Sequence, residues 1–199
     1  MSTKILLVRH GETDWNVIHR FQGSSDVPLN DTGREQAQKL ALRLSSETFD
    51  AIYSSDLLRA AETAQIIAQQ PIIYDARLRE IHFGVFEGLT FTEIMEQYPH
   101  EWDLWRKRQA PPPEGEEIAD VATRVQVFLE DILTQHSEQK ILIVTHGGII
   151  GMIATQLLNH PPHKIWQFRF DNTSITEFGF YPQGIVLVRL NDVCHLTQC

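Results

Sequence analysis

Two runs of apolar residues in this chain lack the alternating polar positions of a half-exposed strand. They cover residues 5–8 (Ile-Leu-Leu-Val) and residues 141–144 (Ile-Leu-Ile-Val). Such runs are typical of parallel strands that are buried on both faces of a sheet. A His-Gly pair follows each run, at His10 and at His146. Because open α/β sheets bind ligands at the carboxyl ends of their strands, the pattern places both histidines at a candidate site.

Helical periodicity connects these and other strand-like segments. Residues 118–133 have the clearest amphipathic pattern, and the apolar run at 141–144 follows them directly. This alternation of helix and strand predicts a parallel α/β sheet. Other helices are expected at residues 32–44 and 56–68, from residue 90, and at 148–158, and other strands at 50–55, 72–74, 166–170, 175–179 and 185–188.

Local signals refine some of these elements. Thr32 with Glu35, and Thr90 with Glu93, have the spacing of a capping box at the start of a helix. Residues 21–30 contain Gly and Pro without a clean period, and this composition indicates a loop that can fold over the site. The strands after residue 165 are expected at the edge of the sheet, with an antiparallel hairpin among them.

Aromatic residues are concentrated in residues 86–116, an insertion that we expect over the site. Phe91, Tyr98, Trp102 and Trp105 belong to it. Two interpretations stay open: these rings pack over the core, or they form a lid that selects the substrate. The three prolines at 111–113 indicate a stiff connector and not a domain boundary.

Composition and charge limit the partners of the protein. The 199 residues are 42% apolar, which is enough for one core, so we expect one domain over residues 1–199. The formal net charge of −9 argues against nucleic acids and anionic membranes as partners. The four apolar residues after Lys4 are too few for a signal peptide or a membrane span, so a cytoplasmic protein is expected. Cys194 and Cys199 lack the spacing of a zinc or redox pair, and we expect reduced thiols.

The polar residues at the predicted strand ends suggest phosphate chemistry. Arg59 lies in the first turn of a predicted helix, where the helix dipole disfavours a cation unless an anion binds there too. Arg9 and Arg59 together could bind a doubly charged phosphate. A neutral His10 could then attack phosphorus, while an acid such as Glu80 protonates the departing alkoxide. The further candidates are His146, Asn16 and Gln22.

Competing sites are disfavoured by the motifs. The sequence contains nine histidines but no His-Glu-x-x-His pattern or comparable ligand cluster, and Arg9 beside a ligand would repel a cation. Neither a phosphate-binding P-loop nor a dinucleotide-binding glycine fingerprint occurs. We therefore expect neither a metal nor a cofactor.

Four blocks of sequence, in order, resemble the histidine phosphatase superfamily, which includes the cofactor-dependent phosphoglycerate mutases. The blocks are residues 7–16 (LVRHGETDWN), 54–64 (SSDLLRAAETA), 78–88 (LREIHFGVFEG) and 144–148 (VTHGG). The resemblance implies an α/β, phosphoglycerate mutase-like fold with a mainly parallel central sheet flanked by helices on both faces.

The resemblance also implies roles for individual residues. His10 would be the phosphorylated nucleophile, and Arg9, Arg59 and His146 would bind the phosphoryl group. Glu80 would donate the proton to the leaving group and later activate water. The positions that match the phosphate pocket of the family are Asn16, Gln22, Gly23 and Gly147.

The sequence favours a phosphatase over a mutase. Residues 83–90 resemble the phosphatase branch, and Gly147-Gly148-Ile149 lacks the asparagine that mutases show beside their second histidine. The substrates implied are phosphoserine, α-ribazole phosphate, phosphoglycerate or sugar phosphates. A mutase stays open because residues 105–108 resemble the mutase segment that binds a carboxylate. A catalytically silent module that binds a phosphorylated ligand also stays open, as does a homodimer.

Overall fold

A six-stranded sheet in the order β3-β2-β4-β1-β5-β6 forms the centre of the structure, a computed structural model that describes residues 2–197. The strands are β1 (Thr3–Arg9), β2 (Ala51–Ser54), β3 (Ile73–Tyr74), β4 (Lys140–Thr145), β5 (Ile175–Tyr181) and β6 (Gly184–Asp192). The α-helices are α1 (Asp14–Val17), α2 (Asp31–Leu44), α3 (Leu58–Ile67), α4 (Phe91–Gln97), α5 (Pro99–Arg106), α6 (Ile118–Gln135) and α7 (Gly147–Leu157). Short 3-10 helices are η1 (Ala76–Leu78), η2 (Gly84–Phe86), η3 (Pro162–Gln167) and η4 (Cys194–Leu196).

The sheet is mainly parallel, as predicted. Parallel pairs join β1 to β4, β4 to β2 and β2 to β3. The antiparallel pairs join β1 to β5 and β5 to β6, so only the hairpin at the end of the chain departs from the parallel arrangement.

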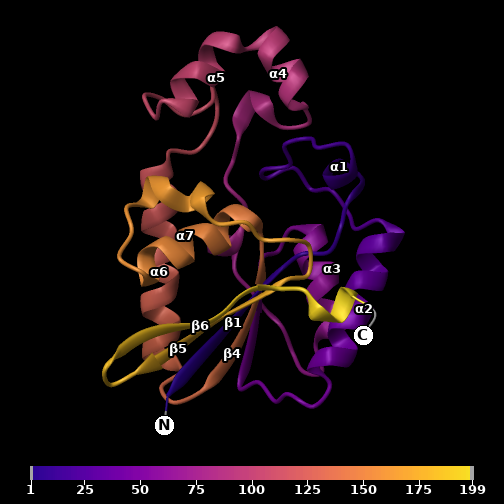
Figure 1. Ribbon diagram of the computed structural model, residues 1–199, viewed down its shortest axis with the longest axis vertical. Helices are drawn as coiled ribbons and strands as arrows, with labels where there is room; N and C mark the ends of the chain where they lie inside the picture. The colour runs from indigo at the N-terminus through magenta and orange to yellow at the C-terminus, as the bar shows by residue number, and fades with distance from the viewer. Residues whose placement is uncertain (1, 198–199) are drawn as a thin grey trace.

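Helices cover both faces of the sheet, and the apolar runs explain why. In β1, the side chains of Ile5 and Leu7 pack into the core beneath α6 and α7, whereas Leu6 and Val8 pack into the core beneath α2 and α3. Figure 1 shows these two helix pairs on opposite sides of the sheet. Successive strand residues point to opposite faces, so a strand in the middle of three layers must be apolar at every position. The predicted fold class is confirmed.

The start of α2 differs from the prediction. The helix begins after Asn30, whose side-chain oxygen accepts a 2.8 Å hydrogen bond from the backbone N–H of Gly33. The expected capping box at Thr32 and Glu35 is therefore wrong by two residues, because Asn30 is an equally good cap and lies outside the helix. The capping box of Thr90 and Glu93 at α4 is confirmed.

The predicted strand at residues 166–170 is also wrong. Residues 162–167 form η3, and residues 168–174 form no strand before β5 begins. The alternation of Trp166, Phe168 and Phe170 has another cause, since these rings line a cavity. The hairpin of β5 and β6 is confirmed, with β6 at the edge and β5 inside the sheet.

The aromatic insertion lies at the end of the molecule where the parallel strands have their carboxyl ends. Figure 1 shows α4 and α5 at the top, opposite the amino terminus. Among residues 2–197, no helix is long and apolar enough to cross a membrane. Cys199, one of the two expected reduced thiols, lies outside the described residues.

Candidate active site

The register of β1 and β4 brings the two histidines together. Arg9 pairs with Thr145 in the parallel ladder, so the next residues, His10 and His146, leave the sheet side by side. The backbone N–H of His10 continues the ladder with a 3.0 Å bond to the carbonyl of Thr145. The two imidazole ring centroids lie 5.2 Å apart. Two segments 136 positions apart in sequence therefore form one site because both strands end at the same edge.

A hydrogen bond fixes the tautomer of His10. Its Nδ1 lies 2.7 Å from the carbonyl oxygen of Gly11, and a carbonyl can only accept, so Nδ1 carries the proton. The lone pair is consequently on Nε2. Burial lowers the pKa of His10 well below its ordinary value, and the positive charges of Arg59 and Arg9 lower it further. The ring is only 3% exposed and neutral at pH 7, which is the form a nucleophile needs.

Arg59 is fully buried in the first turn of α3. Its guanidinium donates to the carbonyls of Gly23 and Ser25 at 2.6 and 2.8 Å, and no described carboxylate forms an ion pair with it. Burial lowers its pKa to about 10, so it remains charged at neutral pH. The Nε atom has no hydrogen-bond partner among the described residues. A buried cation held only by carbonyls retains its positive potential for an anion.

Arg9 supplies a second guanidinium at the same edge. One terminal nitrogen donates to the carbonyl of Phe170 at 2.7 Å, whereas its buried Nε is without a partner among the described residues. Burial lowers the pKa of Arg9, and the carboxylate of Glu80 opposes that shift. Gly147 begins α7 beside it, with space for a Cβ 3.7 Å from the Nε of Arg9. The site thus combines two cations in a protein of net charge −9.

His146 precedes the first turn of α7 and is fully buried. Its Nε2 lies 2.9 Å from the hydroxyl of Ser55, and its Nδ1 has no partner in the described chain. Burial, with repulsion from Arg59, lowers the pKa of His146 well below its ordinary value. When Ser55 donates to Nε2, the Nδ1–H of this neutral ring is a donor for an anionic oxygen.

Three carboxylates near the motifs have different environments, which the sequence does not distinguish. Glu80 lines the cavity beside Arg9 and accepts from the backbone N–H groups of Ile81 and Gly148 at 3.0 and 3.1 Å. Glu12 is turned away to Asn30, whose side chain donates to it at 3.0 Å. Of Glu80, Glu12 and Glu87, Glu80 alone lines the cavity.

Glu87 has a structural role. Its carboxylate accepts from the backbone N–H groups of Ser24, Ser25 and Phe83 at 2.8, 2.9 and 3.0 Å, and from both serine hydroxyls. This clamp fixes the loop whose carbonyls hold Arg59. Gly23 in that loop has a φ of +53°, and a Cβ there would overlap the carboxylate of Glu87, so glycine is required.

Asn16 and Gln22 differ in how their amides are held. The Oδ1 of Asn16 accepts from the backbone N–H and hydroxyl of Thr13, both at 3.1 Å, in the capping box of α1. This arrangement leaves the Nδ2 of Asn16 as a donor at the cavity wall. Gln22 is 9% exposed, and its Oε1 is buried without a partner among the described residues.

Asn172 is a polar residue of the site that the sequence analysis missed. Its Nδ2 donates to the carbonyl of His10 at 3.0 Å and to the Oδ1 of Asn16 at 3.3 Å. It therefore joins the histidine loop to the amide at the cavity wall. The sequence Asp-Asn-Thr at 171–173 resembles an ordinary turn, and no signal in it indicates a contact with residue 10.

A cavity of about 430 Å³ opens beside these residues. Of the predicted site residues, Arg9, Asn16, Glu80 and Gly147 line it. The other five are buried and are not part of its lining: His10, Gln22, Gly23, Arg59 and His146. Within residues 2–197, no cluster of three His, Cys, Asp or Glu side chains could hold a metal ion.

Most of the buried polar atoms without partners lie at this site. The described chain has six such side-chain atoms, and four belong to predicted site residues: Arg9 Nε, Gln22 Oε1, Arg59 Nε and His146 Nδ1. Unsatisfied buried groups are rare in folded proteins, because each costs about 1–3 kcal/mol. Arg9 and Arg59 are close enough to both histidines to lower the pKa of each, and the two imidazole rings are 5.2 Å apart. Guanidinium and imidazole N–H groups gathered in this way can bind a tetrahedral oxyanion beside His10.

Comparison with known proteins agrees with this geometry. Residues 5–193 match the model of the histidine phosphatase superfamily (branch 1). The chain is 36% identical over 200 residues to phosphoserine phosphatase 1 of Hydrogenobacter thermophilus, covering 98% of this chain and 95% of that protein. It is also 36% identical over 209 residues, with the same coverages, to a Proteus mirabilis protein named probable phosphoglycerate mutase GpmB. The crystal structure of the α-ribazole phosphatase from Shigella flexneri superposes with a TM-score of 0.88 at 31% identity, covering 96% of each chain.

Proposed function

The chain belongs to the histidine phosphatase superfamily, and we propose that it hydrolyses small phosphorylated metabolites through a phosphohistidine on His10, without a metal. The observation that carries the proposal is the group of buried donors around His10. Arg9, Arg59 and His146 each have a buried nitrogen without a partner in the described chain. The oxygens of a phosphoryl group are acceptors of suitable charge and geometry for all three.

In the first step, Nε2 of His10 attacks phosphorus. The N–P bond forms as the P–O ester bond breaks, and the charge on the phosphoryl oxygens is stabilised by Arg9, Arg59 and His146. The departing alkoxide takes a proton from the carboxyl group of Glu80. The product of this half-reaction is the free alcohol.

In the second step, water replaces the alcohol. Glu80, now a carboxylate, accepts a proton from that water, whose oxygen attacks phosphorus. The N–P bond breaks, inorganic phosphate leaves, and His10 returns to its neutral form. The hydrogen bond of its Nδ1 to Gly11 is present throughout, so the lone pair is always regenerated on Nε2.

Asn16, Gln22, Gly23 and Gly147 complete the proposed phosphate pocket. The free Nδ2 of Asn16 is a further donor at the cavity wall, and the backbone around Gly23 holds Arg59 in place. The substrates proposed are phosphoserine, α-ribazole phosphate, phosphoglycerate or sugar phosphates. The relatives named above as phosphoserine and α-ribazole phosphatases support the first two.

A cofactor-dependent phosphoglycerate mutase is the second candidate. It is supported by the relative named as a probable mutase, which this chain covers to 95% of its length. Incubation with 3-phosphoglycerate and a catalytic amount of 2,3-bisphosphoglycerate separates the two activities. A mutase yields 2-phosphoglycerate, whereas a phosphatase yields inorganic phosphate and glycerate.

We further propose that residues 1–199 act as one catalytic domain and that the chain assembles as a homodimer. The site draws on residues from both ends of the sequence, from Arg9 to Asn172, which supports a single domain. At the sheet edge, β6 exposes Ile185, Val186 and Val188, each more than 40% accessible. Light scattering on the full chain measures the oligomeric state.

Phosphate release from p-nitrophenyl phosphate and from a panel of metabolite phosphates tests the proposed function. The wild type should turn over in EDTA, and His10→Ala should not. His100→Ala, which removes an exposed histidine in α5, is the matched control and should retain wild-type activity. Absence of phosphate release from every ester, with ligand binding retained, would instead identify a catalytically silent binding module.

A further inference from the structure

The walls of the catalytic cavity are aromatic rather than cationic. Its lining includes the rings of Trp15, Phe21, Phe83, Trp105, Trp166 and Phe168. Apart from Arg9, which faces the phosphoryl group in the proposed mechanism, its other guanidinium belongs to Arg20. The charge of that side chain is already paired, because it forms contacts of 2.6 and 3.1 Å with the carboxylate of Glu93 and a further bond to the carbonyl of Gly88.

This distribution of charge disfavours a carboxylate on the leaving group. Phosphoserine and phosphoglycerate each carry one, and burying it without a cationic partner is costly. An uncharged alcohol carries no such cost, and aromatic walls favour a flat ring through edge-to-face contacts. The rings already pack in this manner, with Phe83 and Trp105 at a centroid distance of 5.8 Å and an interplanar angle of 87°.

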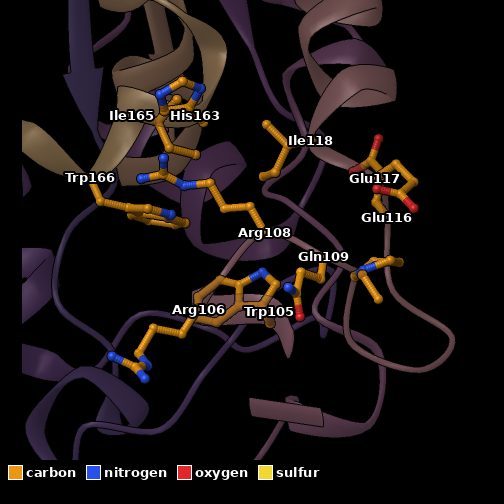
Figure 2. A pocket seen from close by; sticks show the side chains of 12 residues that line it. Trp105, Arg106, Arg108, Gln109, Glu116, Glu117, Ile118, His163, Ile165 and Trp166 are labelled. Carbon is orange, nitrogen blue, oxygen red and sulfur yellow. The ribbon is translucent and has the colours of Figure 1, made fainter. Parts of the chain in front are cut away.

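A second cavity of about 290 Å³ adjoins the first. Trp105, Ile165 and Trp166 line both cavities, so these side chains form the edge between them. The two indole rings contact each other, with centroids 6.0 Å apart and an interplanar angle of 67°. Figure 2 shows both rings at the wall of this second cavity. Trp166 is 51% exposed, a large apolar surface that the fold itself does not require.

The charges around the second cavity balance. Its lining contains Arg106 and Arg108, together with Glu116 and Glu117. Arg106 is paired with Asp103 at 2.9 Å, and Glu116 is paired with Arg124 at 2.7 Å. Arg108 and Glu117 form no ion pair among the described residues, and their charges are opposite. The lining therefore has no net charge to attract an anionic group, whereas an uncharged ring gains contact with the indoles.

We infer that the preferred substrates are phosphomonoesters whose alcohol carries an uncharged aromatic ring system, held at Trp105 and Trp166 and extending into the second cavity. The inference rests on the proposed phosphatase function and names the substrate class of the same site. The combined volume of the two cavities lies in the range of ordinary small-molecule sites and is large enough for more than one ring beyond the phosphoryl group.

A series of esters of primary alcohols tests the inference, because similar alkoxide leaving groups make similar demands on the proton donor. The series consists of ethyl phosphate, 2-phenylethyl phosphate, 2-(2-naphthyl)ethyl phosphate and phosphoserine. Relative to ethyl phosphate, kcat/KM should rise at least about tenfold for the naphthyl ester, with the phenyl ester between them. Phosphoserine should show no such gain.

Variants at Trp166 test whether the rise in kcat/KM for the aromatic esters depends on the indole between the two cavities. Trp166→Ala should reduce the ratio of kcat/KM for the naphthyl ester over ethyl phosphate to near one, and Trp166→Phe should recover part of it. Phe91→Ala is the matched control, because Phe91 is 53% exposed and lies outside both linings. This control should leave the ratio unchanged. Urea denaturation of each variant verifies that the fold is retained.

The outcomes separate this inference from the proposed function. Hydrolysis of ethyl phosphate that depends on His10, with phosphoserine as good as or better than the naphthyl ester, would overturn the inference and leave the phosphatase intact. A carboxylated naphthyl ester that exceeds the uncharged one would likewise refute the requirement for an uncharged ring. If no ester is hydrolysed, the proposed function fails and the inference fails with it.

Discussion

The backbone N–H of Gly148 donates a 3.1 Å hydrogen bond to the Oε2 of Glu80. Gly148 lies in the first turn of α7, two residues after His146, so the helix start that positions one site residue also positions the carboxyl group. A Cβ at Gly148 would come within 2.5 Å of the other oxygen of Glu80, so only glycine permits this approach. The carboxyl group of Glu80 is thus held at a fixed place on the cavity wall.

Glu80→Gln should distinguish proton donation from positioning. The amide keeps the shape of the side chain but cannot protonate an alkoxide, so phosphorylation of His10 by an alkyl phosphate should slow by roughly 10² or more. p-Nitrophenyl phosphate should be affected much less, since p-nitrophenolate departs without a proton. Pre-steady-state phosphorylation rates with both substrates measure the difference. Equal losses would show that Glu80 only positions the site.

Glu87→Gln serves as the matched carboxylate variant. Glu87 accepts from three backbone N–H groups and two hydroxyls, and a neutral amide cannot replace all of these bonds. We expect a loss of about 1–3 kcal/mol in the free energy of unfolding, measured by urea denaturation. Any loss of activity should be the same for both leaving groups. A loss restricted to alkyl phosphates would identify Glu87 as the acid.

His10→Ala should abolish turnover while phosphate still binds. The substitution removes the nucleophile, and Arg9 and Arg59 retain their charges. Isothermal titration with inorganic phosphate should give an affinity within about tenfold of the wild type. Rapid quenching of the wild type should trap a phosphohistidine that is labile in acid and stable in base. Near wild-type kcat in this variant would refute the assigned nucleophile.

Chelation should not affect hydrolysis. The described residues offer no cluster of metal ligands, and the two arginines supply the positive charge that a metal would otherwise provide. Activity measured after dialysis against EDTA should match that of the untreated protein. Loss of activity that Mg²⁺ or Zn²⁺ restores would contradict the mechanism.

Asn172→Ala should lower kcat and weaken phosphate binding together. The side chain donates to the carbonyl of His10 and to Asn16, so its removal frees both the histidine loop and the amide at the cavity wall. We expect a loss of about tenfold in kcat/KM, equal for alkyl and p-nitrophenyl phosphates because Glu80 is unaffected. Asn172→Asp should be more severe, since a carboxylate cannot donate to either oxygen. Unchanged kcat/KM in both variants would exclude this positioning role.

Stability should fall as the pH falls from 7 to 5. Burial lowers the pKa of His10 and of His146 in the folded state, so below about pH 6.5 the unfolded chain binds protons that the folded chain does not. Each histidine then lowers the free energy of unfolding by at most about 1.4 kcal/mol per pH unit. Urea denaturation at pH 7, 6 and 5 measures how steeply the free energy of unfolding falls with falling pH. This slope should be smaller for His10→Ala than for the wild type. The exposed-residue variant His100→Ala should keep the wild-type slope, and equal slopes in all three proteins would contradict the prediction.

Local pattern alone was sufficient for the layered fold. The unbroken apolar runs that form β1 and β4 indicate strands buried on both faces. Such burial requires helices on both sides of the sheet. The same runs end in His10 and His146, so their common edge follows from parallel pairing without any coordinates. Helical periodicity likewise located α6, because a helix that packs on a sheet must carry a continuous apolar stripe.

Tertiary contacts decided the chemistry of individual groups. Sequence spacing does not separate Glu80 from Glu87, since their roles depend on which N–H groups each carboxylate meets in the folded chain. Asn172 reaches His10 across 162 positions, and the fit of that contact depends on how β5 pairs with β1. The alternation of Trp166, Phe168 and Phe170 suggested a strand but instead lines a cavity. Apolar periodicity predicts which side chains are kept from water. Only the packed structure determines whether such a side chain lies in the core or lines a ligand site.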